Sequence, residues 1–186
     1  MMARYFYCIV LAFTCFCTSC GGDDGSTARQ FTGPITFDQL ERGTAHAEVS
    51  GNEDFAITGY VGANNSLIAN FDGKEYVVLF VEINSFEPSE SKRVSFKFFI
   101  PRALEQGIPN NGEIPIASES SALDETYATV FIAGGSTSYA SSEMTTGVLT
   151  ITNSSLEEVV FDMEFDLENI TSGSGGSVDM NGVMKF

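Results

Sequence analysis

The fold of this chain is decided by residues 66–84, which read SLIANFDGKEYVVLFVEIN. The Asp72-Gly73 pair separates two runs rich in β-branched and aromatic residues. This dipeptide favours a type I′ turn, because both central positions of that turn need positive φ. The pattern therefore predicts a β-hairpin formed by residues 66–71 and 75–84. Val77–Val81 is apolar at every position, which indicates a central strand covered on both faces or a strand with one ligand-binding face.

Outside this hairpin, apolar and polar residues alternate with the period of two that is typical of strands. Pro101 and Gly107 flank a segment that predicts one or two helical turns. The sequence thus predicts an all-β fold, an antiparallel β-sandwich or open barrel of about ten strands with one short helix near 101–106. Besides the hairpin, we expect strands over residues 44–50, 55–61, 94–100, 113–117, 126–133, 146–153, 159–168 and 178–186.

The first twenty residues have the pattern of an export signal. Arg4 supplies a positive start, and residues 5–16 are apolar but too short to span a bilayer as a helix. Thr18-Ser19-Cys20, followed by Gly and Asp, resembles the lipobox of Gram-negative lipoproteins, although Cys17 replaces the usual aliphatic residue. In that family a small residue precedes a cysteine that is lipidated and becomes the mature N-terminus. The resemblance implies lipid attachment at Cys20 and anchoring to the outer membrane, on its periplasmic or cell-surface face.

The sequence accordingly predicts three segments. Residues 1–19 are a lipoprotein signal peptide that is removed, 20–33 a lipidated flexible tether, and 34–186 a single β-sandwich domain. The alternative for the N-terminus is an ordinary cleaved secretion signal. All four cysteines lie at or before position 20, so the domain can form no internal disulfide and depends on its core for stability.

The chain is strongly acidic, with nine Lys and Arg against 25 Asp and Glu and a formal charge of −16. Lys92-Arg93 is its longest basic cluster, which argues against nucleic acid as a partner, because a phosphate backbone requires clustered positive charge. The sequence contains no second apolar segment of spanning length and no polybasic patch. We therefore expect the membrane to be reached through the N-terminal lipid alone.

The C-terminal part of the chain carries a second resemblance. It reads TGVLTIT at 146–152, FDMEF at 161–165 and VDMNGVMKF at 178–186. These segments resemble the closing three strands of small bacterial outer-membrane lipoproteins of unknown function, which read G-x-L-T-I-T, F-x-F and N-G-x-F. The usual Gly before the F-x-F strand is Val160 here. The resemblance implies a β-sandwich domain, and it transfers no catalytic residue.

One predicted strand carries acids at alternate positions. Same-face neighbours on a strand lie about 6.8 Å apart, so two of them can share a Ca²⁺ ion only with an oxygen donor from an adjacent strand. The alternative is a solvated face whose repulsion discourages edge-to-edge pairing, opposite Lys97 or Arg93. These candidate cation-binding residues are Asp162, Glu164, Asp166 and Glu168, and the sequence specifies no metal site and no cofactor.

Catalytic chemistry has little support in the sequence. His46 is the only histidine, and the alternation around it predicts that it faces solvent. One imidazole, with no cysteine after Cys20, excludes His/Cys zinc sites and a Cys-His nucleophile pair. The acids are numerous, but no spacing singles out a catalytic pair. We therefore expect no catalytic residues and no enzyme.

The function expected from the sequence is a non-catalytic, lipid-anchored envelope module that binds or scaffolds, with a glycan or another envelope protein as partner. The alternatives are a carboxylate-dependent, glycosidase-like hydrolase and a carrier of a small apolar ligand. Two acids about 5 to 9 Å apart in a cleft favour the hydrolase, and a closed barrel with an empty apolar lumen favours the carrier. The candidate ligand-binding residues are Tyr76, Phe80, Tyr127 and Tyr139.

Overall fold

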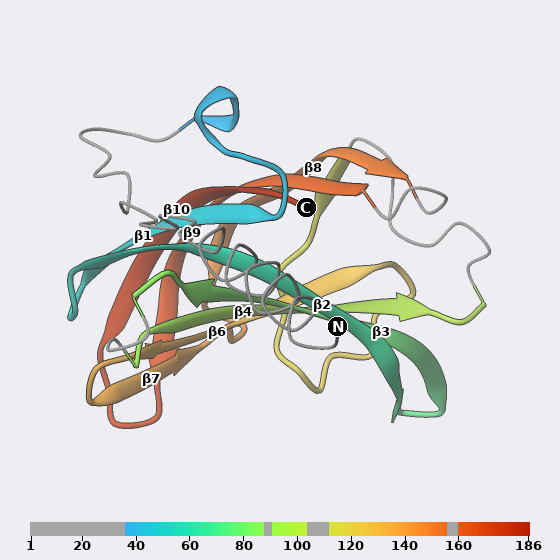
Figure 1. The fold of residues 1–186 in the computed structure, drawn as a ribbon. Coiled ribbons are helices and arrows are strands. Elements are labelled where there is room, and N and C mark those ends of the chain that lie inside the picture. The colour runs from blue at the N-terminus through green and yellow to red at the C-terminus, as the bar shows by residue number, and fades with distance from the viewer. Residues whose placement is uncertain (1–35, 88–90, 104–111, 156–159) are drawn as a thin grey trace, which may run out of the picture. The chain divides into compact units, whose positions relative to one another are not determined.

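The computed structural model describes residues 36–87, 91–103, 112–155 and 160–186, without the side chains of 65–67, 154–155 and 160–161. All of them belong to one compact unit, Gly33–Phe186. It consists almost entirely of strands, with a single 3₁₀ turn, η1 (Phe37–Gln39), before the first of them (Figure 1). The strands are β1 (Thr44–Gly51), β2 (Phe55–Phe71), β3 (Lys74–Ser85), β4 (Arg93–Pro101), β5 (Gly112–Ile114), β6 (Tyr127–Gly134), β7 (Thr137–Ala140), β8 (Thr146–Ser155), β9 (Val160–Ser172) and β10 (Ser177–Lys185).

The strands form one antiparallel sheet that closes into a barrel. Their order is β10-β1-β2-β3-β4-β6-β7-β9-β8-β5, and β10 also pairs with β9, so eight strands complete a ring while β8 and β5 extend from it. The predicted all-β antiparallel architecture of about ten strands is confirmed. Of the two expected forms the sheet takes the barrel, and the barrel is closed rather than open. Closure satisfies the strand edges that an open sheet would leave unpaired.

The predicted hairpin is confirmed at its turn. Asp72 has φ 50° and Gly73 has φ 78°, as a type I′ turn requires, and Phe71 pairs with Lys74 across it. The strand before the turn is longer than expected: β2 joins the two predicted strands 55–61 and 66–71, with a register shift between Asn64 and Leu67. A bulge lets a long strand bend with the barrel wall instead of ending.

Two local features differ from the expectation or lie beyond the described residues. Strand β7 was not expected, because its Ser- and Thr-rich sequence resembles a loop. The helix predicted near 101–106 falls mostly on residues outside the described ranges, since Pro101 ends β4 and only the turn residues Arg102 and Ala103 follow before the gap.

Strand β9 has an edge that two other strands share. Strand β8 pairs with residues 160–168 of β9, and β7 pairs with Thr171 and Ser172 beyond them. At the β8 end the wall continues through β5 and a parallel bridge between Ile116 and Ala128. Residues 112–117 therefore link β8 to β6 at this end of the wall. The barrel wall splits into two branches between β9 and β6.

Ser141 joins the two branches of this split wall. Its backbone N–H donates to the Val130 carbonyl at 2.9 Å, and its Oγ accepts from the Val130 N–H at 3.1 Å. The same hydroxyl donates to the Ala117 carbonyl at 2.8 Å. A single serine thus satisfies backbone groups of β6 and of the 115–117 branch where the sheet is discontinuous.

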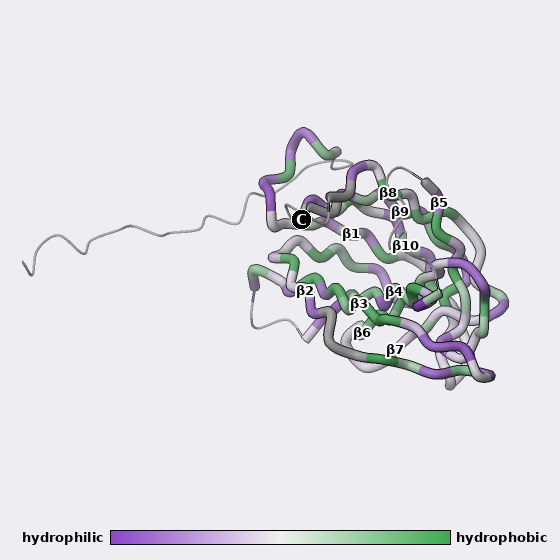
Figure 2. The backbone as a smooth tube through the Cα atoms, turned by 90° about the vertical axis from the view of Figure 1, so that its right-hand side faces the viewer, coloured by the Kyte–Doolittle hydropathy of each residue, from purple (hydrophilic) through white to green (hydrophobic). Residues whose placement is uncertain are grey.

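The lumen of the barrel is packed with side chains. The core residues Ala45, Ala47 and Val49 occupy alternate positions of β1, and Figure 2 shows the change of hydropathy along the strands. Phe96 of β4 and Phe165 of β9 lie on strands that do not pair, yet their ring centroids are 5.1 Å apart. An eight-stranded barrel is just wide enough for side chains to fill it. Because side chains fill the lumen where these two rings meet, the structure does not favour the alternative of an empty apolar lumen that holds a ligand.

The ring of Phe165 also requires a glycine opposite it. A Cβ added at Gly182 of β10 would lie 2.6 Å from Phe165 Cζ and 2.3 Å from the His46 carbonyl oxygen. Ala47, the partner of Gly182 on β1, is likewise small and fully buried. The barrel therefore places small residues on β1 and β10 against the large aromatic side chain of β9.

His46 departs from its predicted place in solvent. It does lie on the face of β1 opposite Ala45 and Ala47, but only 7% of it is exposed. The side chains of its pairing neighbours, Thr58 and Val183, flank it, and its Nδ1 is hydrogen-bonded to Thr58 Oγ1 at 2.7 Å. Burial lowers the pKa of this imidazole below its usual value, partly opposed by Glu48. His46 is thus a neutral part of the barrel wall at pH 7.

We predict that Gly182→Ala lowers the free energy of unfolding by about 2 kcal/mol, because the added methyl group overpacks the lumen against Phe165 and backbone that cannot move away. Chemical denaturation of the soluble domain measures this loss. The matched control is Gly173→Ala, where an added Cβ meets nothing within 4 Å. Equal stability of the two variants would show that the lumen is looser than described.

Candidate functional site

Among the described residues, the candidate ligand-binding surface is the outer face of β3, β4 and β6. Cross-strand register places its side chains in three parallel rows, one residue per strand. A groove of about 250 Å³ lies over this face, and Glu119, Ala140 and Ser141 also line it. We name these three rows the groove face. They are Phe80, Lys97 and Thr129; Glu82, Ser95 and Phe131; and Asn84, Arg93 and Ala133.

Aromatic and cationic side chains lie together on the groove face. Arg93 Cζ is 5.8 Å from the centroid of the Phe131 ring, a cation–π distance. Its Nε lies 3.4 Å from a carboxylate oxygen of Glu82. Lys97 is ion-paired with Glu119. The groove face together with Glu119 therefore carries two cations and two carboxylates, a locally balanced strip on a chain whose formal charge is −16.

Two hydroxyl-bearing residues form the floor of the groove. Ser95 is 5% exposed and Thr129 7% exposed, and both line the groove. Within the part of the chain that the structure describes, no hydrogen bond links either hydroxyl to another residue. A hydroxyl in such a place keeps its donor and acceptor capacity for water or for a ligand.

The groove wall is a segment, residues 117–124, that packs across the outside of the barrel. It covers a second apolar cluster formed by Tyr76, Val78, Phe99 and Tyr127. The Tyr76 hydroxyl donates to the Leu123 carbonyl at 2.7 Å, and the Tyr127 hydroxyl donates to the Ser121 carbonyl. The outer face of β3 is therefore covered at Tyr76 and Val78, whereas Phe80 further along the strand lines the groove.

The four aromatic residues expected to bind a ligand separate into two groups. Phe80 is half-buried and lines the groove. Tyr76 and Tyr127 are fully buried, and Tyr139 is 2% exposed and packs in the lumen core. This corrects the expectation of a surface site at the three tyrosines: the 117–124 segment covers Tyr76 and Tyr127, and Tyr139 faces the lumen. Burial raises the pKa of both Tyr76 and Tyr127, so their hydroxyls stay protonated and donate.

The acidic strand face does not gather into a metal site among the described residues. Glu164, Asp166 and Glu168 are exposed, whereas Asp162 is 8% exposed and lies 3.5 Å from Arg42 Nη1. The cation opposite this face is thus Arg42, not Lys97 or Arg93 as considered from the sequence. No group of three His, Cys, Asp or Glu side chains within those ranges is placed to hold a metal ion.

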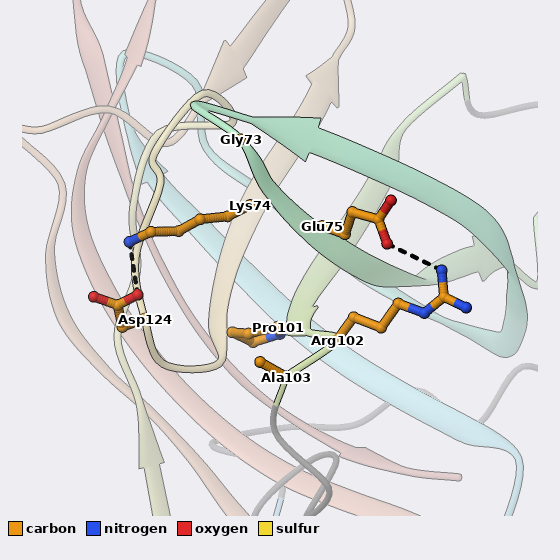
Figure 3. A pocket seen from close by; sticks show the side chains of 7 residues that line it. All are labelled: Gly73, Lys74, Glu75, Pro101, Arg102, Ala103 and Asp124. Atoms are coloured by element: carbon orange, nitrogen blue, oxygen red, sulfur yellow. Dashed lines mark hydrogen bonds and ion pairs between the residues drawn. The ribbon is translucent and has the colours of Figure 1, made fainter.

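A second hollow, of about 430 Å³, lies beside the β2–β3 turn (Figure 3). Two ion pairs span it. Lys74 Nζ lies 2.7 Å from Asp124 and donates to the Ala122 carbonyl at 2.7 Å, and Arg102 Nη1 lies 3.0 Å from Glu75. Lys74 therefore helps to fix the 117–124 segment, and Arg102 fixes the end of β4 to β3. The charged groups of this hollow serve the fold.

Groove residues missed by sequence reasoning are Arg93 and Lys97, considered only as partners for acids, and Ser95, Glu119, Thr129 and Phe131. The sequence shows the alternation of the residues on β4 and β6, but it does not show which segment packs against their outer face. Cys20, the predicted signal peptide 1–19 and the predicted tether 20–33 lie outside the described residues. No helix within the described ranges is long and apolar enough to cross a membrane.

Comparison with protein-family models, with curated proteins and with solved structures finds no match for this chain.

We predict that Tyr127→Phe loosens the 117–124 segment and lowers the free energy of unfolding by about 1 kcal/mol, because the Ser121 carbonyl loses its donor. Amide exchange of residues 118–124 should accelerate more than exchange of the barrel strands. Tyr60→Phe is the matched control, since Tyr60 is 61% exposed and no hydrogen bond to its hydroxyl is found among the described residues. Unchanged exchange in Tyr127→Phe would contradict the anchoring role of this hydroxyl.

Proposed function

We propose that this chain is a lipid-anchored, non-catalytic module of the Gram-negative outer membrane that binds a saccharide in the groove over the β3–β4–β6 face. Lipid attached to Cys20 holds it at the membrane, and residues 20–33 tether the barrel domain. The barrel domain binds the ligand.

The observation that carries the binding proposal is the combination of groups in one groove. Phe80 and Phe131 supply apolar faces suited to the C–H side of a sugar ring. Lys97, with the floor hydroxyls of Ser95 and Thr129, supplies donors, and Glu119 supplies acceptors. Small-molecule sites combine apolar surface with a few convergent polar groups in this way. A sugar has both an apolar face and a rim of hydroxyls, so it matches such a lining.

Support for a non-catalytic role comes from the state of the carboxylates. Glu82 and Glu119 are each engaged by a cation, Arg93 and Lys97 respectively. We assign both carboxylates to hydrogen bonding with ligand hydroxyls. If the protein instead hydrolysed the glycan, the binding experiment below would detect the cleavage. The apolar-carrier alternative has less support, because Phe96 and Phe165 meet across the lumen.

The anchoring proposal rests on the residues before the barrel. Cys20 follows Ser19 and precedes Gly21, Gly22 and two aspartates, and no cysteine lies after it. A single lipid chain binds a membrane only marginally, whereas multiple acyl chains hold a protein stably. The acidic domain adds no electrostatic attraction to an anionic membrane surface.

We predict that the soluble domain, residues 26–186, binds a subset of saccharides on a glycan array carrying neutral, acidic and host-type glycans of one to six sugar residues. Phe80→Ala and Lys97→Gln should each weaken binding about tenfold or more, equivalent to about 1.4 kcal/mol. Met144→Ala, at a side chain 70% exposed and outside the groove, is the control. Thermal melting of each variant separates lost binding from lost folding.

A uniformly flat array would overturn saccharide binding. Cleavage of a bound glycan during the assay, lost in Glu82→Gln or Glu119→Gln, would instead make the protein a hydrolase.

We predict that Cys20→Ser abolishes incorporation of labelled palmitate and releases the protein from the membrane fraction, because the thioether to the lipid cannot form. Mass spectrometry of the mature N-terminus should find an acylated Cys20 in the natural chain. Ser19→Ala, which keeps a small residue before the cysteine, should still be processed. An unacylated mature N-terminus in the natural chain would leave an ordinary secreted protein.

A further inference from the structure

Another hollow, here called the adjoining hollow, lies next to the saccharide groove on the same outer face and is separate from the hollow beside the β2–β3 turn. It has a volume of about 580 Å³, and its lining includes Glu82, Asn84, Ser91, Lys92, Arg93 and Ala133. Arg93 belongs to both hollows. Because the three rows of the groove face succeed one another along β4, the two hollows form one continuous path across the barrel wall.

The length of this path exceeds that of one small ligand. Lys97 and Arg93 are four residues apart on one strand, which corresponds to about 13 Å at the usual rise. The adjoining hollow extends beyond Arg93 toward Ser85 and Ser91. A single sugar ring placed on Phe80 would leave this half of the path unused.

Arg93 lies where the groove meets the adjoining hollow, and its side chain is held in place there. Its guanidinium packs over the Phe131 ring, and Glu82 engages its Nε at 3.4 Å. The side chain is held from below and from one side, yet it is half-exposed. A guanidinium has five N–H donors in a rigid plane, so the remaining ones can serve ligand groups on either side of the junction.

An exposed aromatic side chain lies on the neighbouring strand, beside the far end of the path. Tyr60 of β2 pairs with Asn84 in the row that contains Arg93, and it is 61% exposed. Phe86 supports it edge to face, with ring centroids 4.5 Å apart. Phe80 lies at the other end, and Phe131 lies between them under Arg93. Aromatic surface at both ends with hydrogen-bonding groups between them suits a chain of sugar rings.

The charge of the path selects among such chains. Arg93 is balanced by Glu82 and Lys97 by Glu119. Lys92 and Glu87 also line the path, so three cations face three carboxylates and the path offers no excess positive charge. The rest of the chain is acidic, and its field repels anions. An uncharged polysaccharide meets neither repulsion nor an unpaired buried charge.

We infer that the groove and the adjoining hollow form consecutive subsites for one extended, uncharged glycan chain, which crosses from Phe80 to Tyr60 over Arg93. This inference rests on the proposed saccharide binding and names the class and minimum size of its ligand.

The test compares neutral oligosaccharides of one to six sugar residues, taken from the series that binds on the array, by calorimetric titration of residues 26–186. Affinity should rise about tenfold or more between the shortest binding member and the longest, then level off once both subsites are filled. Asn84→Ala and Tyr60→Ala should weaken the longest oligomer severalfold and leave the shortest unchanged. Phe80→Ala should weaken both, and Met144→Ala neither.

Each alternative result has a distinct meaning. Length-independent affinity, or an equal effect of Asn84→Ala on short and long oligomers, would overturn the extended path while saccharide binding stands. Preference for uronic-acid chains over neutral ones would overturn the uncharged ligand class. A flat array would overturn the proposed function and this inference together. Melting curves of Asn84→Ala and Tyr60→Ala confirm that any loss arises in a folded domain.

Discussion

Strand β9 has one edge that two strands must share, and much of the outer surface follows from this constraint. Its thirteen residues outrun any single partner, so β8 pairs with the first part and β7 with the last two residues. The opposite side of the gap is shared in the same way, since β6 meets Ile116 at Ala128 and β7 from Phe131 onward. A closed barrel has no free edges, and here closure is reached by two branches instead of one continuous strand.

The division of the wall also creates the groove. The chain leaving the 115–117 branch has to return to the start of β6, and it does so across the outside of the barrel as the 117–124 segment. Tyr76 and Tyr127 hold that segment by their hydroxyls, and Ser141 links it to β6. The space between this segment, β7 and the β3–β4–β6 face is the groove. The same polar contacts that complete the sheet therefore determine the shape of the candidate site.

Charge is distributed to match this arrangement. Three of the nine Lys and Arg residues, Lys92, Arg93 and Lys97, fall at the start of β4 or on its outer face, in a chain with 25 acids. Each packs on an aromatic ring or pairs with a carboxylate: Lys92 Nζ lies 5.1 Å from the Phe55 centroid, Arg93 packs on Phe131, and Lys97 pairs with Glu119. The groove is thereby a neutral strip on an acidic surface. Elsewhere the basic residues Arg42, Lys74 and Arg102 tie strands or loops to carboxylates.

The sequence by itself determined the strands and the hairpin. Alternation has a period that only strands share, and Asp72-Gly73 adopts the positive φ values that few other dipeptides tolerate, so local chemistry was sufficient. It also marked Phe80 as a ligand candidate. Tertiary structure alone decided that the sheet closes, that β7 is a strand, and that Tyr76, Tyr127, Tyr139 and His46 are buried. Each of these depends on what lies against a strand face, and residues distant in sequence supply that cover. The groove combines side chains from β3, β4 and β6 with Glu119 and Ser141, and only cross-strand register brings such residues together.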